Sequence, residues 1–130
     1  MSRSLNKVML IGNVGADPEI RSTTSGMRTA KVRLATNRRQ KAGEEWVDVP
    51  EWHHLDFFDR LAEVVERWVN KGDRLYVEGQ IRYSKSQDDQ GVEKYWTNIA
   101  VKEMVMLGSK GGDNYGDGGA PEGGGATIGS

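Results

Sequence analysis

A cluster of histidines and carboxylates is the first place in this chain where side chains could do chemistry. The possible metal ligands in the run EWHHLDFFD are Glu51, His53, His54, Asp56 and Asp59. The aromatic content of this run predicts an extended strand, in which neighbouring side chains point to opposite faces. His54 and Asp56 then lie on one face, and two ligands do not make a metal site. The spacing therefore predicts no metal.

No catalytic motif accompanies this cluster. The sequence contains no H-E-x-x-H helix, no P-loop and no G-x-S-x-G turn. It also has no cysteine, which excludes disulfides and thiolate metal sites. We therefore expect a protein that is not an enzyme and that uses no cofactor.

Aromatic stacking is the other chemistry that the same strand offers. Trp52 and Phe58 fall on one face, about 20 Å apart at the usual rise of a strand. Rings on one side of a sheet, beside cations, form a platform on which unpaired bases can stack. The alternative is that both rings belong to the core. That alternative is disfavoured, because Leu55 and Phe57 already fill the inward face of the strand.

Positive charge is concentrated in the first third of the chain. Residues 1–42 carry nine Lys/Arg and two Asp/Glu, although the whole chain has a net charge of −1. In the strand predicted over 28–36, Lys31 and Arg33 alternate with apolar residues, so the two cations lie side by side on the outer face. This pattern indicates one positive surface on a weakly acidic protein.

These side chains must be positioned by residues 51–82, which are predicted to form a strand, a helix and a second strand. Asp59 is expected to cap a helix of about eleven residues, with its carboxylate accepting from the amides of the first turn. Lys71 is expected in the last turn, and Gly72 is expected to end the helix in a left-handed conformation. The predicted apolar stripe of the helix consists of Leu61, Val64, Val65, Trp68 and Val69.

The remaining segments complete an all-β pattern with one short helix. Further strands are predicted over 5–14 and 95–107, a polar hairpin loop over 37–50, and a long hairpin over 83–94. Five strands with a helix between the third and fourth describe a small, closed, antiparallel barrel, the OB fold.

The chain divides into two parts by composition. We expect one OB-fold domain over residues 1–108 and a disordered, glycine-rich tail over 109–130. No signal peptide and no apolar run of membrane-spanning length is visible. The expected location is therefore the cytoplasm, with no membrane contact.

A resemblance to the bacterial single-stranded DNA-binding protein family is carried by the segments LNKVMLIGNVGADPEIR, VRLATN, EWHHLDFFDRLAEVVERWVNKGDRLYVEGQIR and YWTNIAVKEMVMLG. It covers residues 3–108. The resemblance implies a homotetramer of barrels, associated with the nucleoid, that wraps single-stranded DNA without sequence preference. Its expected roles are replication, recombination and repair, with no metal or cofactor.

The resemblance also assigns roles to individual residues. Trp52 and Phe58 match the stacking aromatics of the family. Basic positions expected along the DNA path are Arg3, Lys7, Arg21, Arg60, Lys71 and Arg82, to which the alternation adds Lys31 and Arg33. We also include Arg38, Arg39, Tyr83, Lys85 and Trp96 in the predicted DNA-binding surface. Positions expected at subunit interfaces are His53, Tyr76 and Glu78.

The sequence departs from the family where two further tryptophans are common. One would lie in the segment 37–40 and the other at Ser86. Arg38, Arg39, Trp46, Tyr83 and Trp96 are candidate replacements. Alternation predicts that either Tyr95 or Trp96 faces outward but does not decide which. Asp56, on the Trp52 face, is a charge mismatch for a phosphate chain that the sequence does not explain.

Two alternatives concern partners. A barrel of the same fold could bind proteins instead of DNA, and the ring-and-cation platform favours DNA.

The tail lacks the acidic tip with a terminal aromatic residue that is usual in the family. We therefore expect poor recruitment of replication and repair proteins through it, and little change in affinity for single strands when 109–130 is deleted.

Overall fold

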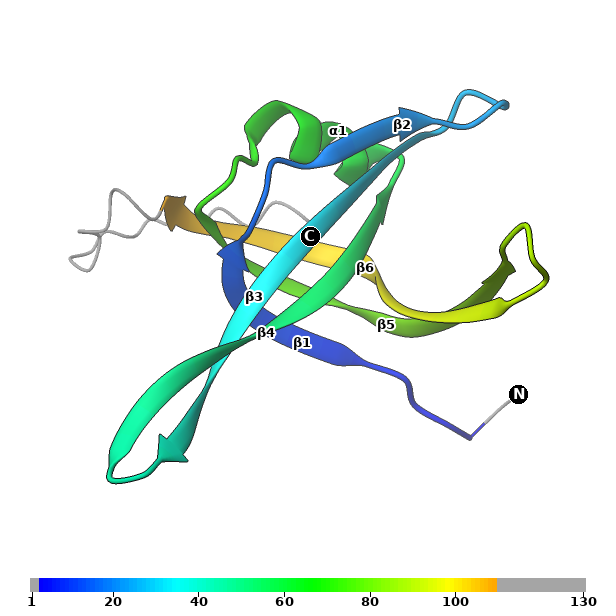
Figure 1. Cartoon of the computed structure of the whole chain (residues 1–130). Coiled ribbons are helices and arrows are strands. Elements are labelled where there is room, and N and C mark those ends of the chain that lie inside the picture. Colours follow the sequence, from blue (N-terminus) through cyan, green and yellow to red (C-terminus); the bar gives the residue numbers. More distant parts are fainter. Residues whose placement is uncertain (1–2, 110–130) are drawn as a thin grey trace.

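The computed structural model describes residues 3–109 (Figure 1). The described elements are β1 (Val8–Val14), β2 (Glu19–Ser22), β3 (Arg28–Ala42), β4 (Glu45–Phe58), α1 (Arg60–Trp68), β5 (Asp73–Gln87) and β6 (Glu93–Ser109). The glycine-rich segment predicted to be disordered lies almost entirely outside the described residues. The domain boundary at residue 108 therefore stays a prediction.

The strands form one sheet that closes on itself. Their order is β1-β5-β6-β4-β3-β2, and a further pairing of β1 with β3 completes a ring of five strands. The predicted all-β barrel with one short helix is confirmed. Our expectation of a wholly antiparallel barrel is wrong, because β4 and β6 pair in parallel at Leu55↔Ile99 and Asp56↔Ala100. A ring with an odd number of strands cannot alternate in direction throughout, so one neighbouring pair must be parallel.

The ring closes where β1 passes from β5 to β3. Asn13 pairs with Arg74 of β5 and with Ala35 of β3. Gly12, just before this point, lets the two backbones approach, because a Cβ on it would lie 2.3 Å from the carbonyl oxygen of Ala35. A residue with a side chain at position 12 would therefore push β1 away from β3.

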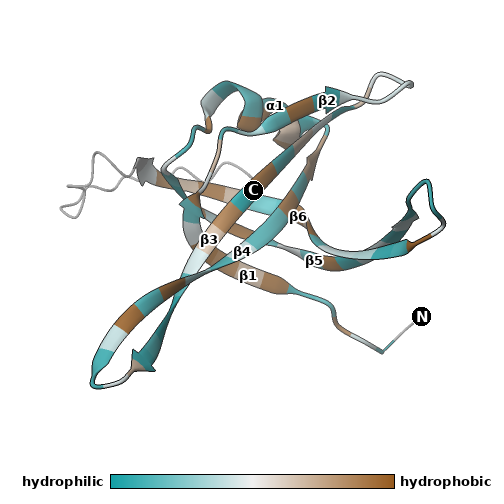
Figure 2. Cartoon of the chain, viewed as in Figure 1, coloured by the Kyte–Doolittle hydropathy of each residue, from teal (hydrophilic) through white to brown (hydrophobic). Residues whose placement is uncertain are grey.

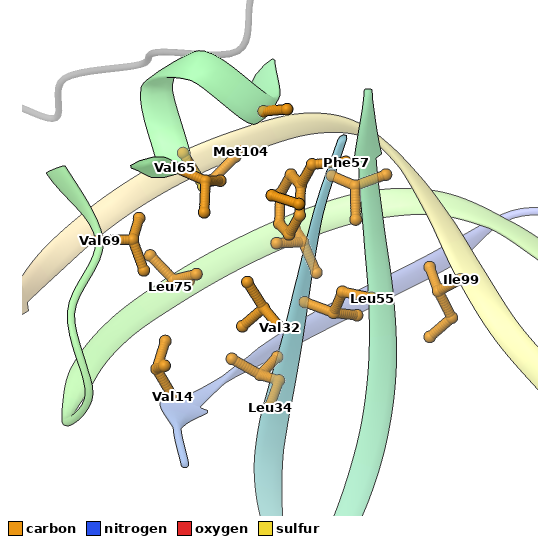
Figure 3. Close-up of a cluster of buried hydrophobic side chains, with 14 residues drawn as sticks. Val14, Val32, Leu34, Leu55, Phe57, Val65, Val69, Leu75, Ile99 and Met104 are labelled. Atoms are coloured by element: carbon orange, nitrogen blue, oxygen red, sulfur yellow. The ribbon is translucent and has the colours of Figure 1, made fainter. Parts of the chain in front are cut away.

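The core fills the ring with aliphatic and aromatic side chains (Figure 3). Leu34, Leu55, Phe57 and Leu75 are fully buried, and each contributes about 1.5–3 kcal/mol through the hydrophobic effect. Helix α1 packs on β3 and β4 and adds Ala62 and Val65 to the same cluster, which Val69 joins just after the helix ends. The short helix is therefore held by burial of one face.

The ends of the helix differ from the sequence-based prediction. Helix α1 has nine residues, and Asp59 makes no side-chain capping hydrogen bond. The chain turns directly from β4 into the helix with Asp59 at φ 57°, not in the extended conformation from which a side chain caps the first turn. Val69 is already extended, so Lys71 lies beyond the last turn. Gly72 has the predicted positive φ, but in the turn that follows the helix. Trp68, which we assigned to the apolar stripe, is exposed.

Residues 37–50 are not a polar loop, although the predicted hairpin is confirmed. Strands β3 and β4 stay paired out to Ala42↔Glu45. Gly43 has φ 70°, which suits a connection of two residues between twisted strands. This β3–β4 hairpin and the hairpin of β5 and β6 project from the barrel and are mostly hydrophilic (Figures 1 and 2). Across the described part of the chain, no helix is long and apolar enough to span a membrane.

Candidate nucleic-acid interface

The outer surface of β3 and β4 carries the side chains that alternation placed there. We call the surface formed by Lys31, Arg33, Trp52 and Phe58 the β3–β4 face. Trp52 and Phe58 are 42% and 43% exposed, whereas Leu55 and Phe57 between them are fully buried. The two rings are therefore not core residues of this chain. The predicted alternation is confirmed.

The Trp52 ring is held in place on both sides. The Arg33 guanidinium carbon lies 4.4 Å from the ring centroid, a cation–π contact. The ring also rests against Gly15, where an added Cβ would come within 2.2 Å of a ring carbon. Because the indole is fixed before any ligand arrives, little side-chain entropy is lost when a flat group stacks on its open part.

Asp56, which the sequence did not explain, has partners on both carboxylate oxygens. Lys31 Nζ lies 3.1 Å from Oδ1, and Asn98 Nδ2 donates to Oδ2 over 2.9 Å. Asp56 thus ties β3 to β4 and links both to β6, next to the short parallel pairing. Its charge is balanced within the protein. In consequence Lys31, predicted to contact DNA, is already engaged with an acid.

A groove of about 520 Å³ lies between the β3–β4 face and the base of the β5–β6 hairpin. Its lining residues are Ala16, Asp17, Glu19, Lys31, Val32, Arg33, His54, Leu55, Asp56, Ser84, Trp96 and Asn98. It combines a ring, two cations and three carboxylates. This mixed lining suits a flat, neutral, hydrogen-bonding group better than a phosphate.

Trp96 is the aromatic residue of β6 that lines this groove. Its indole Nε1–H donates to Ser86 Oγ over 3.1 Å, and 46% of the residue is exposed. Tyr95 points to the opposite face of the hairpin, where its hydroxyl donates to Glu93. That hydrogen bond raises the pKa of Tyr95. Alternation predicted that only one of these two rings faces outward, and this is wrong, because both rings are exposed on a hairpin that projects from the barrel. Of the two, Trp96 lines the groove.

The predicted cations fall into two groups. Those with a carboxylate within 4 Å are Lys7, Arg21, Lys31, Arg38, Arg39 and Lys85. Those without such a pairing to any described acid are Arg3, Arg33, Arg60, Lys71 and Arg82. Tyr83, also predicted to contact DNA, is exposed on the β5–β6 hairpin.

These acidic partners were not predicted from the sequence. Two of them lie directly opposite their cation in the sheet, at Lys31↔Asp56 and Arg39↔Asp48. Once the register of β3 against β4 is known, cross-strand charge pairs of this kind can be read from the sequence. The missing information was therefore the register.

A second exposed surface lies on β1 and β5, which we call the β1–β5 face and define by Met9, Ile11, Tyr76 and Glu78. Met9 and Ile11 are 60% and 49% exposed, and they pair with Glu78 and Tyr76 respectively. β1 is hydrophobic along most of its length (Figure 2). Lys7 Nζ lies 3.4 Å from the Glu78 carboxylate, so this cation belongs to the β1–β5 face.

Tyr76 and Glu78 form a hydrogen-bonded pair on that face. The Tyr76 hydroxyl donates to the Glu78 carboxylate, which raises the pKa of Tyr76 to about 12 and lowers the pKa of Glu78. His53, which we grouped with them as an interface residue, lies on β4 and is hydrogen-bonded to Thr36 at 2.9 Å. Strands β4 and β5 are not neighbours in the ring, so the structure does not join His53 to this pair.

Metal chemistry finds no support at these positions. Within residues 3–109, no three His, Cys, Asp or Glu side chains come together as a ligand set. His53 and His54 point to opposite faces of β4, as alternation predicts.

Comparison with known proteins gives one consistent result. The model of the family described as "Single-strand binding protein family" matches residues 5–107. A single-stranded DNA-binding protein of Xanthomonas campestris pv. campestris is 43% identical over 113 residues, which cover 85% of this chain and 65% of that protein. One from Xylella fastidiosa is 42% identical over 112 residues, covering 85% of this chain and 68% of that protein. The chain thus spans about two thirds of the length of these relatives.

A solved structure shares the fold. The structure described as "Plasmodium falciparum SSB complex with ssDNA" superposes with a TM-score of 0.74 at 29% identity. The match covers 82% of this chain and 98% of that one. The barrel described above is therefore similar in fold to that protein.

Proposed function

We propose that this chain, which belongs to the single-strand binding protein family, binds single-stranded DNA without sequence preference. The observation that carries the proposal is the β3–β4 face, where two half-exposed rings stand on one side of a strand beside Lys31 and Arg33. Every base has a flat face, so stacking on rings does not depend on sequence, and each stacked base is worth about 1–3 kcal/mol.

In this proposal, bases lie against the protein and phosphates lie toward its free cations. Trp52 and Phe58 take bases on the β3–β4 face, and Trp96 takes a base in the groove. Among the predicted DNA-binding residues, phosphates are attracted first to the cations without an acidic partner among the described residues, which are Arg3, Arg33, Arg60, Lys71 and Arg82. A cation that is paired with a carboxylate must give up that pair to contact a phosphate, so each paired cation contributes less to DNA binding.

We propose the β1–β5 face as the contact between copies of the chain. A surface of aliphatic side chains this exposed is costly in water, and a second copy would cover it. The expected assembly is a homotetramer, around which a single strand would wrap from one β3–β4 face to the next. His53 would contact a neighbouring subunit separately from Tyr76 and Glu78.

The biological role that fits this activity is protection of single strands during replication, recombination and repair in the cytoplasm, at the nucleoid. The protein would act without catalysis, metal or cofactor. Contacts with replication and repair proteins would be made outside the β3–β4 face. The domain of residues 1–108 would be sufficient for DNA binding.

The test is a titration of the chain with polythymidine at low salt, followed by intrinsic tryptophan fluorescence. Stacking of bases on Trp52 and Trp96 should quench the emission until the sites are filled. The same titration with duplex DNA is the control, because paired bases cannot splay onto the rings. If polythymidine leaves the emission unchanged, the proposal is lost and the protein-binding alternative takes its place.

A further inference from the structure

Trp46 continues the row of rings on the β3–β4 face. It precedes Trp52 by six residues, as Trp52 precedes Phe58. Since side chains alternate along a strand, an even spacing keeps all three rings on one face of β4. Their partners on β3 are Lys41, Ala35 and Thr29. These are odd-numbered positions of β3, as are Lys31 and Arg33, so all five lie on the same face of that strand. Trp46 is 56% exposed.

The surroundings of Trp46 repeat those of Trp52. The Arg39 guanidinium carbon and Lys41 Nζ lie 5.7 and 6.0 Å from the Trp46 ring centroid, within the range of cation–π contacts. Trp52 has Arg33 in the same role. Each of these two rings is thus an indole with a cation over it, on one face of one strand. The hairpin is therefore built to hold the ring in a defined place and still leave it open.

The charge of the hairpin argues against a phosphate-binding role for it. Arg38 Nε lies 2.9 Å from the Glu51 carboxylate, and Arg39 Nε lies 3.9 Å from that of Asp48. Glu44 and Glu45 follow at the turn. Arg38 and Arg39 are thus paired with acids, and the charge of Lys41 is offset by the two glutamates at the turn, so a phosphate gains little by approaching. What the hairpin offers is the face of Trp46.

We propose that Trp46 is a third base-stacking position, so that the track for a single strand runs along the whole of β4. This inference rests on the proposed function. It adds Trp46 to the base-stacking residues, and it gives the bound strand a direction along β4. Twelve residues separate Trp46 from Phe58, which is about 40 Å at the rise of a strand. A short oligonucleotide would favour Trp52 and Phe58, because Arg33, which has no carboxylate partner among the described residues, lies beside these two rings, whereas Arg38 and Arg39 of the hairpin are paired with acids. A longer one would also reach Trp46.

The experiment compares Trp46→Ala with Val47→Ala on oligothymidines of about 5 and about 15 nucleotides, the range that one OB fold covers. Val47 is the matched control, because it is the exposed neighbour on the opposite face of the same strand. Trp46→Ala should weaken binding of the longer strand about tenfold and change that of the shorter one less than about twofold. The slope of log affinity against log salt should not change. Trp46→Phe, which keeps a ring, should recover most of the loss.

Three results would overturn the inference. Equal binding of the longer strand by Trp46→Ala and wild type would remove Trp46 from the track. Equal weakening of both lengths would mean that the substitution acts on the fold, which circular dichroism would also reveal. A lower salt slope would mean that Trp46 acts through Arg39 and Lys41. In each case wild-type binding would persist, whereas failure of the proposed function would abolish binding by wild type as well.

Discussion

Two exposed surfaces of the same barrel carry apolar side chains, and they differ in how charge is mixed with them. On the β3–β4 face, the rings of Trp52 and Phe58 are six residues apart and cations stand between and over them. On the β1–β5 face, Met9 and Ile11 are two residues apart, and the charge of Glu78 is taken up by Lys7 and Tyr76. On the first surface, rings alternate with cations, whereas on the second the exposed aliphatic side chains of Met9 and Ile11 lie together beside Tyr76 and a carboxylate whose charge is already compensated.

The difference indicates which partner each surface suits. Aliphatic groups gain only by leaving water, so a closely fitting apolar surface, such as a second copy, is the partner that stabilises them. Separated rings beside cations keep their hydration and offer flat, polarised faces, which suit bases linked by phosphates. Exposure alone would not have distinguished the two surfaces, because both carry exposed apolar side chains. The arrangement of charged groups among those side chains distinguishes them.

The largest effect is expected from placing a charge on the aliphatic surface. Ile11→Glu would put a carboxylate where we expect two copies to meet, and burying an unpaired charge costs several kcal/mol. Sedimentation at micromolar concentration should show a tetramer for wild type and a smaller species for the variant. Val47→Glu, which places the same charge on the β3–β4 hairpin, should leave the mass unchanged. A tetramer of Ile11→Glu would place the contact elsewhere.

The next largest effect is expected from removing a ring of the β3–β4 face. Trp52→Ala should weaken binding of single strands by about tenfold to a hundredfold, because one stacked base is lost. The salt slope should stay nearly constant, since no phosphate contact is removed. Trp68→Ala is the control, because Trp68 is also an exposed indole but lies on α1. Fluorescence anisotropy over a range of salt concentrations gives both quantities. Equal affinities for wild type and Trp52→Ala would assign this ring to another role.

A smaller effect is expected from removing either cation of the β3–β4 face, and its size should differ between the two cations. Arg33 has no carboxylate partner among the described residues, so Arg33→Ala should lower the salt slope by up to about 0.7, the value for one phosphate contact on a single strand. Lys31 is bonded to Asp56, so its phosphate contact is weaker and Lys31→Ala should lower the slope less. The same anisotropy titrations measure both. Equal slopes for the two variants would show that the Lys31–Asp56 pair opens when DNA binds.

Local periodicity explains what could be predicted from the sequence. The two-residue alternation of 28–36 and 51–58 depends only on neighbouring residues, so it placed Lys31, Arg33, Trp52 and Phe58 correctly on the outside. The apolar side of the helix was also largely predictable from spacing, and Val65 and Val69 are buried as expected. The pattern of five strands with a helix between the third and fourth then predicted the barrel.

What could not be predicted depends on contacts between distant residues. The partners of Asp56 come from two other strands, and neither can be identified without the register. The polar stretch 37–50 was assigned to a loop because polarity outweighed its alternation, and this concealed that Trp46 shares a face with Trp52. The missing cap at Asp59 reflects the sharp turn out of β4, which is set by the closure of the barrel.

The smallest effect concerns pH and the acid on the β1–β5 face. The pKa of Glu78 is lowered from its ordinary value of 4.5, mainly by the hydrogen bond from Tyr76 and further by Lys7. The folded state therefore favours the ionised carboxylate. This contribution to stability is present above pH 4.5 and is lost as the pH falls through the lowered value.

Tyr76→Phe removes the largest cause of that shift and leaves Lys7 in place. The variant should be slightly less stable than wild type at pH 7, and the two should converge at acid pH, where Glu78 is protonated in both. Titration of Tyr76 itself does not contribute in this range, because its pKa is about 12. Urea unfolding at pH 7, 5 and 3 and at one protein concentration measures the difference, since self-association also affects stability. Tyr95→Phe, which loses a similar hydroxyl on the exposed hairpin, controls for loss of a surface hydrogen bond. If the difference between Tyr76→Phe and wild type did not shrink toward acid pH, it would come from packing on the β1–β5 face, and the charge of Glu78 would have no part in holding that surface together.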